Sequence, residues 1–529
     1  MGGEVVGPKA KATANGDVTS HPALAAKPAI HIIVLGASGG PKENNVTALL
    51  VRSVASDWKR GSVIGVDAGV HLGAIEAILR DTQPPDLGKT AALPLPHTLT
   101  TGPFAGFVLP HPTPAQNALH FHQSVVEGFI ITHPHLDHIN GMVINTAAPP
   151  GGRAKRVAGL PYTIATLKTD IFNNRIWPNL TDENNGAGLV TFSRLLDGGS
   201  PVLGEGANRG YLEICDGLLV KTFSVSHGAC IEQHTHRGSI DDGTTTASPT
   251  FPGGGLVDRR RSSAPALAPD APPSSSSSSL CVSESSASFL RDAATAREVL
   301  VFGDVEPDSL SLSPRNRRVW REAAPKIADG HLAAICIECS YDDAQPDDCL
   351  YGHLTPRFLM EELTVLAWEV RALLAASPTA RGKRKRAGSE ITVGGGKRLV
   401  PAGEDAISPR TAVSRSGSGG GGGDANSPHL SSPTARLSLV SGGQTPPLTV
   451  WDAPPPPLPV PVPAALDTGG EVAGGELRGV KVIVIHVKDK MNGGEPAGER
   501  ILRQLRAHEE GARLGCEFVV AREGGSYYL

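Results

Sequence analysis

Seven short apolar runs, rich in β-branched residues, constrain the fold of this chain of 529 residues more than any other feature. Their length and composition are typical of buried strands. Strands mixed with fewer helices predict an α/β or α+β sandwich. The runs are HIIVLG (31–36), SVIGVDAG (62–69), GFIITH (128–133), LLVKTFSVSH (218–227), EVLVFGD (298–304), AAICIEC (333–339) and VKVIVIHV (480–487).

One long helix is predicted over 354–376, LTPRFLMEELTVLAWEVRALLAA. Thr355 is a suitable N-cap residue, and Pro356 suits the first helical position because its missing N–H is not needed there. Leu359 and Leu363 begin a series of apolar residues at helical spacing, so this face of the helix is expected in the core.

Three segments have a composition that does not support a folded core. Residues 1–28 are small and polar, 237–285 contain six consecutive serines, and 376–475 contain five consecutive glycines and WDAPPPPLPVPVP. Such segments bury too little apolar surface to offset the entropy of ordering them, so we predict a disordered N-terminus and two long disordered insertions. The folded domain is then expected in three parts, 29–236, 286–375 and 476–529.

The stretch THPHLDH, residues 132–138, concentrates imidazoles and a carboxylate directly after an apolar run. These are the groups with which proteins bind Zn²⁺ and similar ions. His133 and His135 are two residues apart in an extended segment, so they point to the same side and can bind one ion. Asp137 and His138 are expected to follow a turn and face a second ion. The alternative is a loop of solvated histidines.

Other predicted strands also end on a metal-binding residue type: His227, Asp304 and His486. Each has an ordinary alternative, since a lone histidine is often structural, an aspartate often serves a turn, and a buried histidine can be satisfied within a core. Their shared position at strand ends, together with THPHLDH, favours one metal site.

Two further HxH pairs are weaker candidates. His120 and His122 lie in NALHFHQSVVEG, which is predicted to be helical, and residues two apart on a helix do not face each other. His234 and His236 lie at the edge of the first low-complexity segment, with no strand before them.

HPHLDHINGMVIN resembles the signature of the class II cyclic-nucleotide phosphodiesterases, the fungal-type, low-affinity enzymes of the metallo-β-lactamase superfamily. LGASGGPKENNVTALLV and VDAGVHLGAI before it, and VSHG, FGDVEPD and GHLTP after it, occur in matching order, and the resemblance covers nearly everything outside the insertions. It implies a four-layer αβ/βα sandwich with two divalent metal ions, for which Zn²⁺ is expected. It assigns His133, His135 and His227 to one ion, Asp137, His138 and His486 to the other, and Asp304 to a bridging position.

The resemblance implies metal-dependent hydrolysis of 3′,5′-cyclic AMP, with cyclic GMP as an open second substrate, to the 5′-nucleotide. A hydroxide bridging the metals would attack the cyclic phosphate and expel the 3′ oxygen. This reaction would lower cyclic-nucleotide signalling. The candidate catalytic residues are Asp137 and His353, and His353 precedes a predicted helix N-terminus, where anions are favoured.

Two features beside these residues have open interpretations. Asp67 follows a predicted strand and either orients a ligand histidine or serves as a turn carboxylate. The glycines of LGASGG, at positions 36, 39 and 40, do not form a phosphate-binding pattern, so a tight turn near the site is expected.

Two rival functions remain. One is another hydrolase of the metallo-β-lactamase fold, such as a tRNA 3′-processing nuclease or a thioesterase. The other is a non-catalytic scaffold, which the complete set of ligand residues argues against. The formal net charge of −4 excludes a general basic field for nucleic acid, so no nucleic-acid partner is expected.

Regulation and location are expected to depend on other short stretches. Arg259–Ser263 reads RRRSS and predicts protein-kinase phosphorylation at Ser262 or Ser263 in the first insertion, the alternative being an unmodified charge run. No apolar run is long enough to cross a membrane, so a cytoplasmic protein without a membrane partner is expected. RGKRKR (381–386) leaves a nuclear location open, and a homodimer is left open too.

Overall fold

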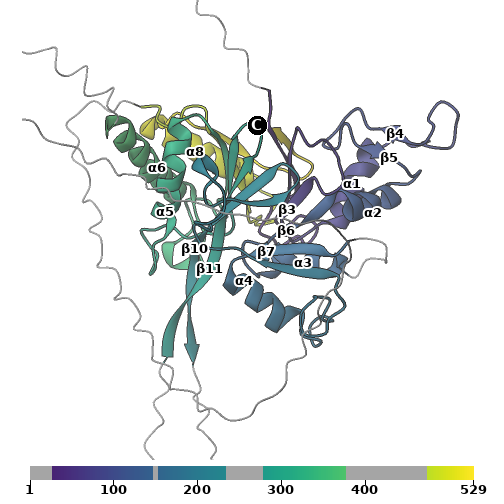
Figure 1. Ribbon diagram of the computed structural model, residues 1–529. Helices are drawn as coiled ribbons and strands as arrows, with labels where there is room; N and C mark the ends of the chain where they lie inside the picture. The colour runs from purple at the N-terminus through teal and green to yellow at the C-terminus, as the bar shows by residue number, and fades with distance from the viewer. Residues whose placement is uncertain (1–26, 147–152, 234–277, 377–473) are drawn as a thin grey trace, which may run out of the picture. The chain divides into compact units, whose positions relative to one another are not determined.

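Two seven-stranded sheets form the centre of the computed structural model, which describes residues 27–146, 153–233, 278–376 and 474–529 (Figure 1). The strand order is β16-β1-β2-β3-β6-β7-β8 in the first sheet and β15-β14-β13-β12-β11-β10-β9 in the second. Apolar side chains of both sheets form one buried cluster between them, and two other clusters join each sheet to its helices. The predicted four-layer αβ/βα sandwich is therefore confirmed.

The first sheet is antiparallel from β16 to β3 and parallel from β3 to β8. Helices α1 to α4 accompany it, and a small two-stranded sheet of β4 and β5 lies apart from it (Figure 1). Its strands are β1 (Ile30–Gly36), β2 (Ala48–Ser53), β3 (Val63–Ala68), β6 (Val126–Ile130), β7 (Lys155–Gly159), β8 (Val190–Arg194) and β16 (Ser526–Tyr528). The other elements are β4 (His97–Thr98), β5 (Val108–Leu109), α1 (Leu72–Thr82), α2 (Pro114–Ser124), α3 (Leu136–Asn145) and α4 (Pro161–Thr166).

The second sheet is antiparallel from β9 to β12 and parallel from β12 to β15. Its outer face is covered by α5, α6 and α8, which share a buried cluster with it. The strands are β9 (Leu212–Cys215), β10 (Leu218–Gln233), β11 (Ser278–Asp292), β12 (Glu298–Phe302), β13 (Leu332–Glu338), β14 (Lys481–Ile485) and β15 (Glu517–Val520). The helices are α5 (Asn316–Ala328), α6 (Pro356–Ala376) and α8 (Ala497–Ala512).

The layer between the sheets explains why the strand sequences are almost continuously apolar. Ile32 and Val51 of the first sheet share a buried cluster with Val301 and Ile483 of the second. Neighbouring residues on the same strands pack outward against helices, so both strand faces are buried. All seven predicted strands are present, although β6 ends at Ile130, before the run ends.

The prediction was wrong about the end of β10 and the start of β11. β10 continues past His227 to Gln233, and Gln233 pairs with Ser278 at the beginning of β11, in the long ribbon that Figure 1 shows below the sheets. Residues 278–285, predicted as part of an insertion, therefore belong to a strand. Main-chain pairing with β10 does not require apolar side chains, so a serine-rich sequence can extend the ladder. The other residues of the predicted disordered segments lie, apart from a few at their margins, outside the described parts.

The predicted long helix is present as α6, but its N-terminus is capped differently from the prediction. Thr355 directly precedes the helix, yet its buried hydroxyl has no hydrogen-bond partner among the described residues. The carboxylate of Asp343 instead accepts a hydrogen bond of 2.8 Å from the backbone N–H of Arg357. No helix in the described ranges is long and apolar enough to span a membrane.

Glu362 of α6 is a buried carboxylate that joins α6 to α5 and to the segment after β12. It accepts hydrogen bonds of 2.6 Å from the indole N–H of Trp320 and 2.6 Å from the backbone N–H of Asp308. Burial, reinforced by the nearby charge of Asp308, raises the pKa of Glu362 to about 7. The folded protein therefore binds a proton at this carboxyl more tightly than the unfolded chain does.

This pKa predicts how stability changes with pH. The contribution of the protonated Glu362 carboxyl to the free energy of unfolding is fully present below the ordinary pKa of 4.5, and it is lost as the pH rises toward about 7. The free energy of unfolding of the wild type, minus that of Glu362→Gln, should fall by about 3 kcal/mol across this interval. Urea unfolding of both proteins at several pH values measures the difference, and a difference that does not change with pH would contradict the assignment.

Candidate metal centre

The predicted metal-binding residues meet at one edge of the sandwich because several strands end there. His133 and His135 lie between β6 and α3, and Asp304 follows β12 by two residues. His486 directly follows β14, with a left-handed backbone at φ 57°. His227 was expected at a strand end but lies within β10, where the register shifts between Ser226 and Ala229. Because of this bulge, His227 reaches the edge of the sandwich from inside a strand, whereas the other candidate ligands reach it from strand ends.

Asp137 and His138 differ from the prediction in local structure. They occupy the first turn of α3, for which His135 is the N-cap residue, and they do not follow a separate turn. The sequence pattern did not indicate a helix at LDHINGMV, because this short run directly continues the cluster of candidate ligands. As adjacent helical residues, they present their side chains in different directions toward the same site.

The side chains of these seven residues form two groups that share Asp304. In each group, one ligand atom from every residue lies within 4.8 Å of the corresponding atoms of the others. The first group is His133, His135, His227 and Asp304, and the second is Asp137, His138, Asp304 and His486. The structure thus brings together the same two sets that the sequence resemblance assigned to two ions.

Asp304 lies between the two groups. Its Oδ2 is 3.6 Å from Nε2 of His133, 3.6 Å from Nε2 of His227 and 3.3 Å from Nε2 of His486. Its Oδ1 is 3.3 Å from Nε2 of His138. A carboxylate in this position can contribute one oxygen to each group.

Hydrogen bonds on the far side of the rings orient the buried histidines. The Nδ1 atom of each ring contacts a neighbouring oxygen, so Nε2 is the nitrogen that faces the centre. The Nδ1 contacts are His138 with Asp67 Oδ2 at 2.8 Å, His227 with Gly352 O at 2.8 Å, His486 with Ser340 Oγ at 2.9 Å and His133 with Thr132 Oγ1 at 3.1 Å.

Buried atoms without hydrogen bonds test whether these residues fit metal ions. Among the described residues, Nε2 of His133, Nε2 of His138 and Oδ1 of Asp304 are buried and have no hydrogen-bond partner. An unsatisfied buried polar atom costs about 1–3 kcal/mol, so three at one centre indicate a missing ligand. Imidazole nitrogens combined with carboxylate oxygens suit a divalent ion such as Zn²⁺.

The electrostatics of the centre favour neutral rings at some of the candidate ligands and a protonated ring at another. Burial lowers the pKa of His227 to about 4 and lowers the pKa of His133 well below its ordinary value. Burial alone would raise the pKa of Asp304, but the neighbouring His486 and His138 rings hold it well below its usual range. Burial opposes protonation of His138, but the Asp304 and Asp67 carboxylates outweigh it and raise the pKa of this ring well above its ordinary value. The centre thus combines neutral rings with one ring that favours a proton, and metal binding would displace that proton.

Asp67 contacts a ligand histidine and the loop that carries another ligand. Its backbone has a positive φ of 54° at the end of β3. Besides facing His138, the carboxylate accepts hydrogen bonds of 2.8 Å from the backbone N–H and 2.8 Å from the hydroxyl of Thr132. One side chain thus links the β6–α3 loop to the ring of His138.

His353 lies beside both groups. Its buried partner, Glu338, was not among the candidates predicted from the sequence. The Nδ1 of His353 is 2.8 Å from Oε1 of Glu338. Burial opposes protonation of His353, but the Glu338 carboxylate outweighs it and raises the pKa of the ring. Glu338 is the last residue of apolar strand β13. The strand-end rule that identified Asp304 would also have identified Glu338.

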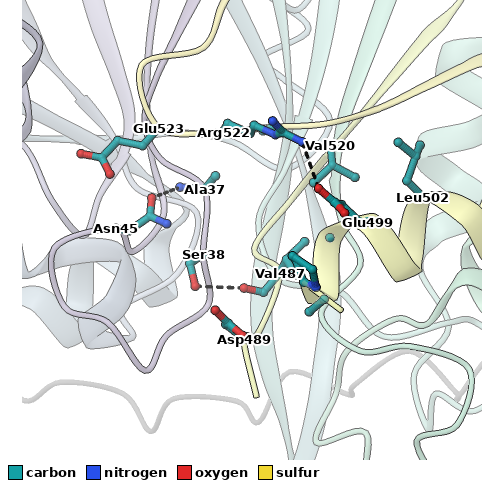
Figure 2. Close-up of a pocket in the computed structure, with 14 residues that line it drawn as sticks. Ala37, Ser38, Asn45, Val487, Asp489, Glu499, Leu502, Val520, Arg522 and Glu523 are labelled. Atoms are coloured by element: carbon teal, nitrogen blue, oxygen red, sulfur yellow. Dashed lines mark hydrogen bonds and ion pairs between the residues drawn. The ribbon is translucent and has the colours of Figure 1, made fainter. Parts of the chain in front are cut away.

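The turn formed by LGASGG packs against His486, and Figure 2 shows part of it. The hydroxyl of Ser38 donates a hydrogen bond of 2.9 Å to the carbonyl oxygen of Val487. A Cβ atom on Gly39 would lie 2.4 Å from Cε1 of His486. The run is therefore a tight turn beside the site, as expected. The cavity of Figure 2, about 420 Å³, is lined by none of the residues of the two metal groups.

The weaker candidates do not join the centre. His120 and His122 lie on α2, and Nδ1 of His122 is 2.9 Å from Nε2 of His71 in a separate buried contact. His234, His236 and the predicted phosphorylation sites Ser262 and Ser263 lie outside the described residues.

A second cavity, of about 500 Å³, adjoins the metal groups. His135, His227 and His353 contribute to its lining, together with residues after β12 and before α6. A ligand in this cavity would contact both candidate metal-binding residues and His353.

Comparison with known proteins gives a consistent result. The family described as class-II cAMP phosphodiesterases matches residues 96–247 and 263–379, about half of the chain. A 3′,5′-cyclic-nucleotide phosphodiesterase of Schizosaccharomyces pombe is 28% identical over 345 residues, covering 65% of this chain and 77% of that protein. One from Candida albicans is 27% identical over 383 residues, covering 65% of this chain and 84% of that protein. The crystal structure of unliganded yeast PDE1 has a TM-score of 0.55 at 18% identity, covering 95% of this chain and 100% of that one, which shows a shared fold.

Gly39→Ala should weaken divalent-metal binding. The added Cβ forces the His486 ring to move, and changes to residues that support a ligand typically lower metal affinity about 10- to 100-fold. Metal content after dialysis at limiting Zn²⁺, measured by mass spectrometry, gives the readout. Gly73→Ala is the matched control because a Cβ there meets no atom within 4 Å. Equal metal content in both variants would contradict the role of the turn.

Proposed function

Because this chain belongs to the class-II cAMP phosphodiesterase family, it is a 3′,5′-cyclic-nucleotide phosphodiesterase, and we propose that it converts cAMP to 5′-AMP at the two groups around Asp304. The observation that carries this proposal is the set of buried ligand atoms without hydrogen-bond partners at Asp304, His133 and His138. The chain has the metallo-β-lactamase fold, in which these residues lie at one edge of the sandwich.

Two divalent ions, with Zn²⁺ as the proposed species, would be held by the two residue groups. Bound there, they would lower the pKa of water toward about 7 and neutralise charge on the phosphate oxygens. Asp304 contributes its two oxygens at the boundary of the groups. Asp67, Gly352 and Ser340 keep the ligand rings in the orientation that binding requires.

His353 is proposed to contact the cyclic phosphate or the departing 3′ oxygen. Its Nδ1 is occupied by Glu338, which leaves Nε2 as the nitrogen available to a substrate. The residue lies between the metal groups and the N-terminus of α6, and it lines the cavity of about 500 Å³. Both positions favour contact with an anion that occupies the metal centre.

The alternative functions are not favoured. A tRNA 3′-processing nuclease or a thioesterase can share the fold, but the family match concerns cyclic-nucleotide phosphodiesterases. Phosphorylation in the first insertion, a homodimer and a cytoplasmic or nuclear location remain predictions.

Purified protein should convert cAMP to 5′-AMP, and His135→Ala/Asp137→Ala should lose this activity. The double substitution removes one ligand from each group, so metal content should fall together with turnover. Product formation by chromatography and metal analysis measure both. His120→Ala, from the histidine pair on α2, is the control and should retain both properties. Metal binding without cAMP turnover by the wild type would refute the proposed substrate.

His353→Gln should lower kcat for cAMP by about 100-fold or more, because a positioned group at the reacting phosphate is removed. Metal content should not change, because His353 is outside the two groups that share Asp304 and belongs only to the neighbouring set of Glu338, His353 and His486. Steady-state kinetics on metal-loaded protein provides the measurement. A kcat within about threefold of the wild-type value would show that His353 is structural.

A further inference from the structure

The cavity beside the metal centre has a second wall that phosphate chemistry does not require. His135, His227 and His353 lie on its metal side. Two loops, one after β12 and one before α6, supply the carboxylates of Glu306, Asp347 and Asp348 together with the apolar and aromatic side chains of Pro307, Leu310, Leu312, Leu350 and Tyr351. Such a combination of apolar and aromatic side chains with charged groups is typical of a small-molecule site.

Tyr351 is the most unusual of these residues. It is 71% exposed, although it is a large aromatic residue. Its backbone has a positive φ of 53°, which costs about 1–3 kcal/mol for a residue other than glycine. Within the described ranges, no hydrogen bond of its hydroxyl and no stacking partner for its ring is found.

The backbone around Tyr351 is firmly attached to the metal centre. The next residue, Gly352, contacts Nδ1 of ligand His227 through its carbonyl oxygen at 2.8 Å. A Cβ on Gly352 would lie 2.7 Å from the carbonyl carbon of His227, so the two segments are in close contact. His353 follows and is fixed by Glu338. The position of Tyr351 is therefore determined relative to the site of the reacting phosphate.

Other exposed apolar residues gather at the same cavity. Leu312 is 65% exposed and Leu310 is 43% exposed. Single exposed apolar residues need no explanation, but several around one cavity at a catalytic centre indicate an apolar ligand surface. In a cyclic nucleotide bound with its phosphate at the metal groups, the flat apolar part that remains is the base.

We propose that Tyr351 stacks on the nucleobase of the substrate while the phosphate occupies the metal centre. This inference rests on the proposed function, because it takes the position of the phosphate from it. Stacking on an aromatic ring contributes about 1–3 kcal/mol per base and does not depend on which base it is. Tyr351 therefore strengthens binding of cAMP and cGMP alike.

The test compares Tyr351→Ala with Tyr351→Phe on three substrates: cAMP, cGMP and methyl riboside 3′,5′-cyclic phosphate, which has no base. Tyr351→Ala should lower kcat/KM about 5- to 150-fold for both nucleotides and leave the base-free substrate unchanged. Tyr351→Phe keeps the ring and should match the wild type. Trp368→Ala, an exposed aromatic residue on α6 outside the cavity, is the control.

Two results would overturn the inference. Equal kcat/KM values of Tyr351→Ala and wild type on cAMP would show that no stacking occurs. An equal loss on the base-free substrate would show general damage to the centre. Calorimetric binding of 5′-AMP and of ribose 5-phosphate tests the same contact without turnover. A wild type that lacks activity would therefore refute the proposed function without deciding whether Tyr351 stacks on the base. Tyr351→Ala should then weaken binding of 5′-AMP alone.

Discussion

The buried carboxylate of Asp304 is the group on which the rest of the site depends. An ionised side chain that is only 2% exposed must be compensated, because burial of an isolated charge is very costly. The compensation comes from four imidazoles whose Nε2 atoms lie within 3.6 Å of its oxygens. Two of these rings come from the β6–α3 region of the first sheet, and two come from strands of the second. The two sheets must therefore stack with their edges aligned for the centre to exist.

The residues that orient the ligand histidines come from several other elements, so the geometry of the centre depends on much of the fold. Asp67 holds His138 from β3, Ser340 holds His486 from the end of β13, and Gly352 holds His227 from the segment before α6. Close backbone approach also matters, since the turn at Gly39 leaves no room for a side chain beside His486. Gln233 and Ser278, on either side of the first insertion, pair with each other and continue the β10–β11 ladder beyond the bulge that carries His227.

The cavity beside the centre connects the chemistry with substrate recognition. Its metal side presents the histidines, and its other side presents leucines and Tyr351. A cyclic nucleotide has the same two-part character, with a charged phosphate and an apolar base. The segment of residues 350–353 is common to both parts, because it carries the exposed tyrosine, the carbonyl that contacts His227 and the ring of His353. In the proposed mode of binding, recognition and reaction therefore share one short segment of backbone.

The sequence by itself determined seven of the strands, the long helix and the seven candidate ligands, because these follow from local rules. Apolar strands buried on both faces have a recognisable composition, and an HxHxDH run is rare by chance. Only the tertiary structure decided that His227 lies in a bulge, that Asp343 caps α6 in place of Thr355, and that Glu338 and Tyr351 lie beside the candidate metal centre. These features depend on contacts between distant parts of the chain, such as Ser340 with His486, which are 146 residues apart. No local pattern encodes a contact of that kind, because it forms only when the two sheets and their helices pack together.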